Sequence, residues 1–276
     1  MKEEYLSLRE VQLEELKILH NVVKYLDKHK LTYCLCGGTL LGAVRHKGFI
    51  PWDDDIDISM KREDYEKFLE YSKTEKIDDS YEVLCIEKNN STRTFCKVVN
   101  KNLPITSKSQ EDKYLWIDIF PLDKLPESLE EAKKLIDKNL FLKGQIYLRT
   151  TKIKDIMKEK KSLKNRIIKI ILKPITYRHS VKYYAKKIIK NARKYENSNS
   201  SKLADAVWPD GYQSIFNPEW FEKTEKIEFE HEIFNAPCGW KEYLSNGYGN
   251  YMELPPEDKR ISHNILVKNR KICLCK

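Results

Sequence analysis

The sequence predicts an α+β fold: a mixed sheet flanked by helices, followed by a more helical and basic C-terminal half. Three observations predict it. Over the first 150 residues, short apolar or alternating segments typical of strands are interleaved with longer segments of helical periodicity. Apolar residues make up 41% of the 276 positions, which is enough for a substantial core. No run of eighteen apolar residues occurs, so a membrane-spanning helix is not expected.

The expected elements follow one another along the first half of the chain. Ser7 followed by Glu10 is typical of a helix N-terminus, and the apolar spacing carries that helix to residue 29. Further helices are expected over 39–46, 62–73 and 127–148. Strands are expected over 31–36, 55–60, 82–86, 94–99 and 115–120, the last of them ended by Pro121.

The second half begins with a strongly basic segment. Between Lys152 and Lys194, sixteen Lys or Arg residues stand against two acidic ones, a local net charge of +14 in a chain of net charge +9. Residues 151–195 are expected to be mostly helical, with an interruption at Pro174. Residues 196–201 are expected to form a flexible link, and short aromatic-rich elements follow.

One part of the basic segment has an amphipathic pattern. The apolar side chains expected near one helical face are those of Leu163, Ile167, Ile170, Ile171 and Pro174. The cations expected off that face are Lys164, Arg166, Lys169 and Lys173. Such a helix suits the plane of an anionic membrane surface. The alternative is that the isoleucines pack on the rest of the protein and the lysines are solvated.

The seven cysteines are scattered, without the spacing of a disulfide framework or a zinc site. Cys34 and Cys36 share one face of an expected strand and are expected to be core thiols, which favours a cytosolic location. The charged, amphipathic N-terminus does not have the pattern of a signal peptide.

A glycine-rich turn follows the apolar run that ends at Cys36. Backbone amides at a turn from strand to helix can bind phosphate, so Gly37, Gly38 and Thr39 are candidate phosphate ligands. The basic triplet Arg45, His46 and Lys47 supplies charge and donors for the same anion. The alternatives are an ordinary turn for the glycines, and helix packing or loop capping for Arg45 and His46.

Four aspartates crowd into five positions just beyond. Asp55 and Asp57 share one face of an expected strand, Asp53 extends that phase, and Asp54 points the other way. Oxygen ligands so close together favour a hard divalent cation, although an acidic run can also be a solvated loop. Asp118 lies between two isoleucines of a later expected strand and completes a three-carboxylate site if the two strands are neighbours.

These motifs together resemble a known superfamily. A Gly-Gly turn, Asp-x-Asp on a strand and a single later Asp resemble the nucleotidyltransferases. Residues 37–60, the following Arg62-Glu63-Asp64-Tyr65, the stretch from Ile117 to Asp123, and the tail from Tyr243 to Pro256 resemble the LicD family more specifically. The resemblance covers residues 10–125 and 230–263 and leaves the basic segment unassigned.

The resemblance implies a nucleotidyltransferase-like mixed sheet and a phosphotransferase for substituted phosphate groups. LicD-like enzymes move phosphocholine from CDP-choline to a sugar hydroxyl of a cell-surface glycan precursor such as teichoic acid, lipopolysaccharide or capsule, releasing CMP. The expected domains are a catalytic core over 1–150, a basic helical segment over 151–200, and a C-terminal part over 201–276 that completes the substrate site. The alternative donor is a CDP-linked glycerol, ribitol or sugar.

The resemblance also assigns roles within the site. Mg²⁺ or Mn²⁺ is expected on Asp55, Asp57 and Asp118, with Asp53 as a further ligand. Asp118 is the expected general base. Choline requires an aromatic cage, with candidates Trp52, Tyr65, Trp116, Trp208, Tyr212, Trp220, Trp240, Tyr248 and Tyr251. Arg260 and His263 are expected either to reach phosphate or sugar, or to be surface charges.

The expected partners are a CDP-linked donor, a lipid-linked glycan acceptor and an anionic membrane surface. The expected location is cytoplasmic, peripheral on the inner face of the cell membrane. A different class, a nucleic-acid-binding module, is disfavoured because the acidic cluster would repel nucleic acid and no recognition motif is visible.

Overall fold

In the computed structural model, the chain is described over residues 5–106, 112–159, 161–260, 262 and 265–269. It falls into two compact units. Unit 1 comprises 1–84, 95–122 and 217–276, and unit 2 comprises 85–94 and 123–216. Residues 123–150, expected in the catalytic core, therefore group with the basic segment, and 217–276 group with the N-terminal residues.

Unit 1 is built on a mixed sheet whose order is β1 (Cys34–Leu35), β2 (Asp57–Lys61), β5 (Tyr114–Lys124), β4 (Cys96–Thr106) and β10 (Leu266–Val267). β2 and β5 are parallel, and the other neighbours are antiparallel. β3 (Tyr81–Leu84) also pairs with β4. Ile58, Ile117 and Ile119 on the parallel pair are fully buried, as expected for a strand pair at the centre of a core.

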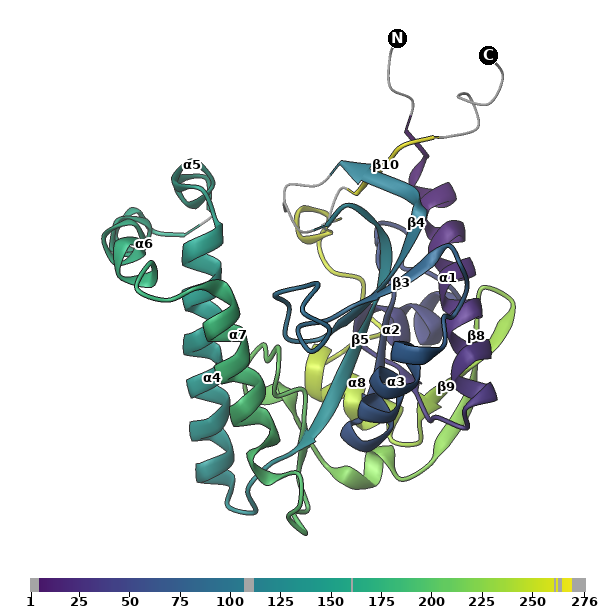
Figure 1. Ribbon diagram of the computed structural model, residues 1–276. Helices are drawn as coiled ribbons and strands as arrows, with labels where there is room; N and C mark the ends of the chain where they lie inside the picture. Colours follow the sequence, from purple (N-terminus) through teal and green to yellow (C-terminus); the bar gives the residue numbers. More distant parts are fainter. Residues whose placement is uncertain (1–4, 107–111, 160, 261, 263–264, 270–276) are drawn as a thin grey trace. The chain divides into compact units, whose positions relative to one another are not determined.

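Helices cover this sheet. α1 (Leu8–Lys28) packs on β4, while α2 (Gly37–His46) and α3 (Arg62–Thr74) pack on β2, as Figure 1 shows. A hairpin of β8 (Thr224–Phe229) and β9 (Glu232–Pro237) contacts α2 and β1, and α8 (Trp240–Tyr248) follows it. The predicted α+β class, a mixed sheet flanked by helices, is confirmed.

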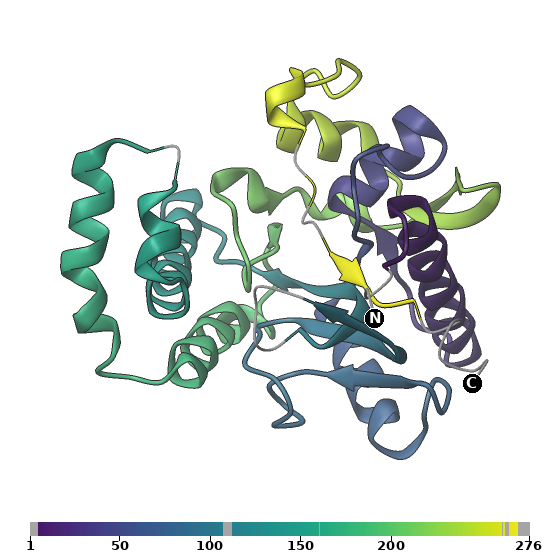
Figure 2. The same ribbon diagram turned by 90° about the horizontal axis from the view of Figure 1, so that it is seen from above.

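Unit 2 is mainly helical. α4 (Leu129–Thr150) packs along α7 (Val181–Ala192), and α5 (Ile153–Met157) and α6 (Leu163–Thr176) gather at the C-terminal end of α4 (Figures 1 and 2). The buried amide of Asn139 donates to the carbonyls of Ile188 and Ala206 and accepts from Asn191, which fixes α4 against α7. The strands are β6 (Leu203–Ala204), which pairs with the last two residues of β5, and β7 (Ile215–Phe216).

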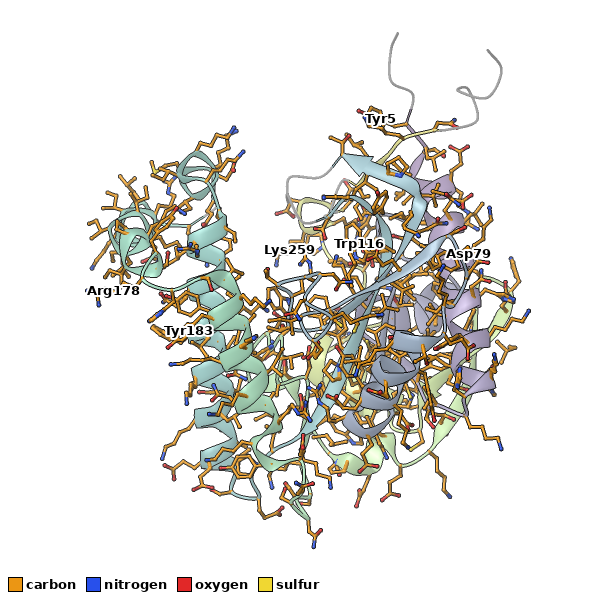
Figure 3. The ribbon with its side chains drawn as sticks, in the orientation of Figure 1. Tyr5, Asp79, Trp116, Arg178, Tyr183 and Lys259 are labelled. Carbon is orange, nitrogen blue, oxygen red and sulfur yellow. The ribbon has the colours of Figure 1, made fainter. Side chains whose placement is uncertain are left out.

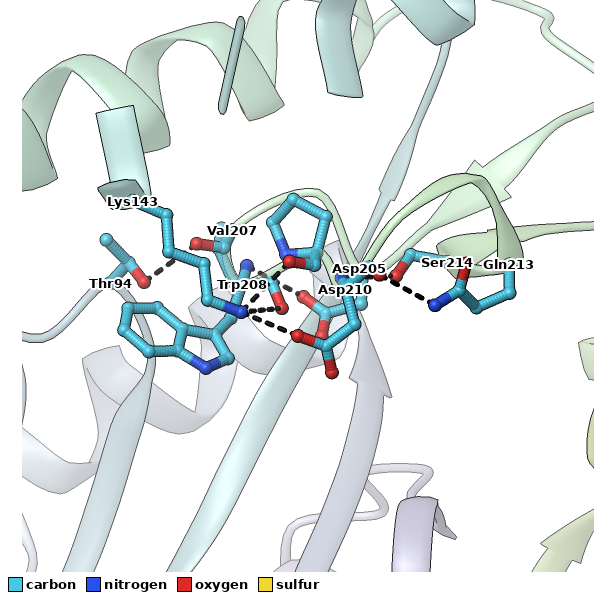
Figure 4. A network of polar contacts seen from close by, with 9 residues as sticks. Thr94, Lys143, Asp205, Val207, Trp208, Asp210, Gln213 and Ser214 are labelled. Atoms are coloured by element: carbon cyan, nitrogen blue, oxygen red, sulfur yellow. Dashed lines mark hydrogen bonds and ion pairs between the residues drawn. The ribbon is translucent and has the colours of Figure 1, made fainter. Parts of the chain in front are cut away.

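A polar network holds the loop after β6, as Figure 4 shows. Lys143 of α4 donates to the carbonyls of Trp208 and Pro209 and to the carboxylate of Asp210, at 3.4, 2.9 and 2.7 Å. Its ammonium also lies 4.4 Å from the centre of the Trp208 ring, a cation–π contact. Trp208, a candidate for a choline cage, is thus engaged by a lysine within unit 2.

Two prolines behave differently from the prediction. Pro121 does not end its strand, because β5 continues to Lys124. Pairing with β4 stops at Ile119 and pairing with β6 starts at Asp123, so the position between them needs no donor on that edge. Pro174 does not interrupt its helix, because α6 continues to Thr176. It removes one hydrogen bond in the last turn, and the break follows before Val181.

Candidate active site

A row of three charged residues crosses the sheet of unit 1. Asp57 of β2 is in register with Asp118 of β5, which is in register with Lys97 of β4. Residues paired across neighbouring strands project to the same face, with backbones about 4.8 Å apart. The adjacency of the two aspartate strands, on which the predicted site depends, is therefore present. Lys97 Nζ lies 3.5 Å from Asp118 Oδ1 and 3.4 Å from Asp112 Oδ1.

The glycine pair makes room for the carboxylates. A Cβ on Gly37 would stand 3.0 Å from Asp57 Oδ2, and one on Gly38 would stand 2.7 Å from Asp53 Oδ2. Gly37 also has φ +54, which favours glycine. The Asp57 amide donates to Thr39 Oγ1 at 2.8 Å, so the start of α2 fixes the start of β2. The turn and the acidic loop, predicted separately, form one structure.

The predicted phosphate ligands lie at the two ends of α2. Gly37, Gly38 and Thr39 form its first turn, whereas Lys47 follows its last residue as an exposed, left-handed C-cap. Ten helical positions span about 15 Å, so these backbones do not converge on one anion. The Gly37 amide donates to the Tyr243 hydroxyl at 3.1 Å.

Arg45 and His46 have structural contacts. Arg45 Nη1 donates to the carbonyls of Tyr251 and Glu253, at 3.0 and 3.1 Å, which ties α2 to the turn after α8. Burial lowers the pKa of Arg45, and burial and the Arg45 charge lower the pKa of His46. These contacts match the loop-capping alternative, and phosphate binding by the two residues stays a prediction.

The acidic loop surrounds Asp57 with like charge. Burial, followed by the charges of Asp55, Asp118 and Asp53, raises the pKa of Asp57 well above its ordinary value, while Lys97 acts in the opposite direction. Asp54 points away, as predicted: its Oδ2 accepts from Ser262 Oγ and the Ile265 amide, both at 2.9 Å. Asp53 and Asp57 lie against the glycine turn, and Asp55 is close enough to raise the pKa of Asp57.

Sequence reasoning missed Glu15 of α1. Its side chain is fully buried, and neither carboxylate oxygen has a hydrogen-bond partner within the described residues. Burial and the charges of Asp55, Asp54, Asp53 and Asp118 raise its pKa well above the ordinary value. Nearby, Gln12 Nε2 donates to the Asp53 carbonyl at 2.8 Å. The signal lay in the helical phase, because Gln12 and Glu15 fall on the same face as the apolar Val11, Ile18 and Leu19.

Lys97 was also missed. The Lys97 side chain is 5% exposed, and its ammonium lies 3.4 Å from the centre of the ring of Trp116, which Figure 3 labels. Its signal was a lysine among the apolar residues of an expected strand. Tyr248 of α8, predicted as a candidate for the choline cage, has its pKa raised by burial and then by Asp57, Cys36, Asp53 and Asp55.

The donor set fits a hard divalent cation. Within the described residues, no three His, Cys, Asp or Glu side chains are already drawn into a metal-holding group. Mg²⁺ sites in transferases, however, commonly use one or two carboxylates, with substrate phosphates and water completing the shell. The Asp57–Asp118 pair, flanked by Asp53 and Asp55 and backed by the unpartnered Glu15, is an all-oxygen set with excess negative charge.

The other predicted substrate contacts are placed as follows. The Arg260 guanidinium lies 5.0 Å from the centre of the Trp52 ring and donates through Nε to the Pro255 carbonyl. His46 meets the same ring edge-on at 6.4 Å. The face of one candidate cage residue is thus covered by a cation from this chain. His263 lies outside the described residues.

Comparison with known proteins defines the class. The family described as "LicD/FKTN/FKRP, nucleotidyltransferase domain" matches residues 30–145, which include the glycine turn, the acidic loop and Asp118. The chain is 32% identical to the lipopolysaccharide cholinephosphotransferase LicD of Haemophilus influenzae, over 94% of this chain and 97% of that one. It is 29% identical to the uncharacterized protein RP689 of Rickettsia prowazekii, over 45% and 48% of the two chains. Human ribitol 5-phosphate transferase FKRP is 49% identical over 43 residues, 16% of this chain and 9% of that one.

The fold and the carboxylate site thus define a phosphotransferase with a nucleotidyltransferase-like catalytic unit. The chain belongs to the LicD family. Among its described helices, none combines the length and the apolarity needed to span a bilayer.

Proposed function

We propose that this enzyme transfers phosphocholine from CDP-choline to a sugar hydroxyl of a cell-surface glycan precursor, releasing CMP. The observation that carries the proposal is the in-register pair of Asp57 and Asp118 beside a glycine turn. A cholinephosphotransferase of similar length and 32% identity supports the choice of phosphocholine and of a glycan acceptor.

The proposed reaction is an in-line displacement. The acceptor hydroxyl oxygen forms a bond to the distal phosphorus of the donor, the bond from that phosphorus to the bridging oxygen breaks, and CMP leaves with the electron pair. Asp118 is the proposed base that takes the hydroxyl proton. Mg²⁺ or Mn²⁺ on Asp55, Asp57 and Asp118, with Asp53 as a further ligand, would neutralise charge on the diphosphate.

Other residues of this chain would orient the donor. Lys97 places a positive charge beside Asp118, at 3.5 Å, on the face where the carboxylates lie. In the first turn of α2 the N-cap Cys36 supplies no side-chain hydrogen bond, and the Gly37 amide meets the Tyr243 hydroxyl, so the amides of Gly38 and Thr39 are the proposed donors to an anion. The Thr39 hydroxyl holds the Asp57 backbone in place, and so keeps the distance between the amides and the carboxylates fixed.

The alternative is transfer of glycerol, ribitol or sugar phosphate from a CDP-linked donor. The short match to human ribitol 5-phosphate transferase FKRP supports it. The two functions share the metal site and differ in the group that accompanies the distal phosphate.

A donor panel tests the proposal. The purified chain is incubated with Mg²⁺, a glycan acceptor and one CDP-linked donor at a time, and CMP is measured by chromatography. We expect CMP from CDP-choline, and loss of that signal with chelator or in Asp118→Asn. The matched control is Asp79→Asn, since the Asp79 side chain is 93% exposed. CMP from CDP-ribitol alone would establish the alternative, and CMP from no donor would contradict both.

We also propose that the enzyme works in the cytoplasm, peripherally on the inner face of the cell membrane. The net charge of +14 between Lys152 and Lys194 supports this location. A lipid-linked acceptor would be presented at such a surface.

A further inference from the structure

Helix α6 of unit 2 is inverted: it turns cations inward and apolar side chains outward. The Lys173 side chain is buried, and its ammonium donates to the carbonyls of Leu148, Arg149 and Thr151 at the C-terminal end of α4. Carbonyls at a helix C-terminus lack intrahelical donors and carry the negative end of the helix dipole. Lys173 therefore caps α4 from the neighbouring helix.

Two more cations follow the same pattern. Lys169 pairs with Glu159 at 2.5 Å, with both side chains largely buried, and Glu159 also accepts from the Tyr147 hydroxyl. Arg166 donates to the Met157 carbonyl at the end of α5. Spacing of three to four residues places these three cations on one side of α6. Their contacts fix the rotation of the helix about its axis.

The opposite side of α6 is apolar and exposed. Its residues are Leu163 (55% exposed), Ile167 (45%), Ile168 (43%), Ile171 (67%), Leu172 (44%) and Ile175 (49%). We call them the α6 outer face. Ile153 and Met157 of the adjoining α5 are also exposed, at 51% and 40%. Soluble proteins rarely expose a large apolar patch, and such a patch commonly marks a site that binds another protein or a membrane.

The sequence pattern placed this helix less accurately. Ile170, expected on the apolar face, is only part-exposed, while Ile168, Leu172 and Ile175 join the outer face. Packing of the isoleucines on the catalytic core, the alternative, stays a prediction. Lys169 and Lys173 are the inward side chains.

We propose that the α6 outer face inserts into the headgroup region of an anionic lipid membrane, with the helix axis in the membrane plane. The charge of its surroundings selects this occupant. Exposed cations lie on and beside the face: Lys164 in the first turn of α6, Arg178 just past its end, and Lys154 and Lys158 on or next to the adjoining α5. Figure 3 shows Arg178 at the outer edge of unit 2, at the end of α6. A second copy of the chain would bring another segment of charge +14 against the first, whereas anionic lipid brings the opposite sign.

The dimensions suit insertion rather than spanning. α6 has 14 residues, about 21 Å of helix, and an apolar face that covers about half of its circumference. Side chains such as Ile171 can enter the acyl boundary while the rim cations meet lipid phosphates. The inference rests on the peripheral location proposed above and names the surface that contacts lipid, while its test involves neither donor nor acceptor and so is independent of the transfer chemistry.

Vesicle flotation tests it with the full chain. The probes are vesicles of phosphatidylcholine alone and of phosphatidylcholine with phosphatidylglycerol. We expect flotation with the anionic vesicles, weakened by added salt. In Ile167→Glu together with Ile171→Glu, the apparent affinity should fall by about tenfold or more. Ile167→Gln with Ile171→Gln separates loss of apolar contact from added negative charge and should also weaken flotation.

A matched control uses another exposed isoleucine. Ile233 on the β8–β9 hairpin is 60% exposed, and Ile233→Glu should leave flotation unchanged. Thermal unfolding of each variant verifies that the fold is intact, which exposed positions permit. The proposal is overturned if the wild type does not float with anionic vesicles, or if the double glutamate variant floats as well as the wild type. It is also overturned if sedimentation shows a dimer that the double variant dissociates.

Discussion

Helices α1 and α6 both bury charged side chains, and the two burials differ in one respect. Glu15 of α1 is fully buried, lacks a hydrogen-bond partner in the described structure and faces further negative charge. Lys173 of α6 is almost as buried but meets three carbonyl oxygens. A buried charge with partners is part of the scaffold, whereas one without partners is costly unless something else supplies the counter-charge. The unpartnered one lies where a cation is proposed.

The two helices also differ in the side chains that they expose. α1 buries most of its apolar residues together with Gln12 and Glu15, so its exposed side is largely polar. α6 turns its cations inward and leaves its isoleucines exposed. The same composition of Lys and Ile could form an ordinary surface helix. The difference therefore depends on the neighbouring groups. Beside α6 these are the terminal carbonyls of α4 and α5 and the Glu159 carboxylate, and beside α1 they are the carboxylates of the acidic loop.

The largest effect is expected at the carboxylates that α1 faces. Asp57→Asn should lower CMP release by about a thousandfold, about 4 kcal/mol, because it removes a proposed ligand at the reacting phosphate. The unfolding midpoint should not fall, since burial and like charge already raise the pKa of Asp57. Activity is measured with the same donor panel, and the unfolding midpoint by circular dichroism. Activity within tenfold of the wild type would remove Asp57 from the site.

The next largest effect is expected at Lys173, the buried charge that has hydrogen-bond partners. Lys173→Met should reduce the free energy of unfolding by about 3 kcal/mol, because it leaves the carbonyl end of α4 without its donor. Lys164→Met is the matched control on the same helix, where the side chain is exposed and a change under about 0.5 kcal/mol is expected. Urea unfolding measures both. Equal effects of the two substitutions would mean that the inward contacts do not hold α6.

Replacing Glu15, the buried charge without a hydrogen-bond partner in the described structure, should change the free energy of unfolding in the opposite direction. Glu15→Gln should increase the free energy of unfolding without metal at pH 7 by about 2 kcal/mol, since burial disfavours in the fold the ionisation that this carboxyl undergoes in the unfolded chain. The pKa of Glu15 is raised in the fold, so the penalty is absent below the unfolded pKa of about 4.3 and grows as pH rises. Urea unfolding between pH 4 and pH 7 measures it.

Added Mg²⁺ should narrow the gain from Glu15→Gln at pH 7, because a bound cation offsets the same negative charge. A gain that is the same at both ends of this pH range would show that the carboxyl is not the source.

The smallest effect compares the two helix starts. Ser7 accepts from the Glu10 amide, and the Glu10 carboxylate accepts from the Ser7 amide in return, whereas Ser162 makes a single cap to the Asn165 amide. Ser7→Ala should therefore cost about 1 kcal/mol and Ser162→Ala about half of that. Urea unfolding orders the two. A larger loss at Ser162 would contradict the ranking.

Much of the fold could be predicted where local pattern and tertiary structure agree. The capping box at Ser7, the helix starting near Gly37 and the strand carrying Asp118 all follow from short-range signals. The phase of the aspartates was predictable for the same reason: alternation puts Asp54 on the other side, where it meets Ser262.

What could not be predicted depends on contacts distant in sequence. Lys97 joins the site because β4 pairs with β5, and Glu15 joins it because α1 packs over the acidic loop; neither pairing has a local signal. Pro121 was misjudged because its tolerance depends on where the neighbouring strands stop. The side of α6 that faces inward depends on the carbonyl end of α4, which periodicity alone does not reveal.

The four aspartates within positions 53–57 have two different roles. Asp53 and Asp57 approach the glycine turn, while Asp54 holds the segment around Ser262 and Ile265. Strand pairing fixes Asp57 at the start of β2, whereas deleting a residue such as Pro51 would shorten the loop before it and shift Asp53 and Asp54 along the chain. The loop would keep its net charge while the Asp54 tether and the Asp53 carboxylate lose their positions. In this loop, a change of length should therefore impair the enzyme more than a conservative substitution, because it displaces several carboxylates at once.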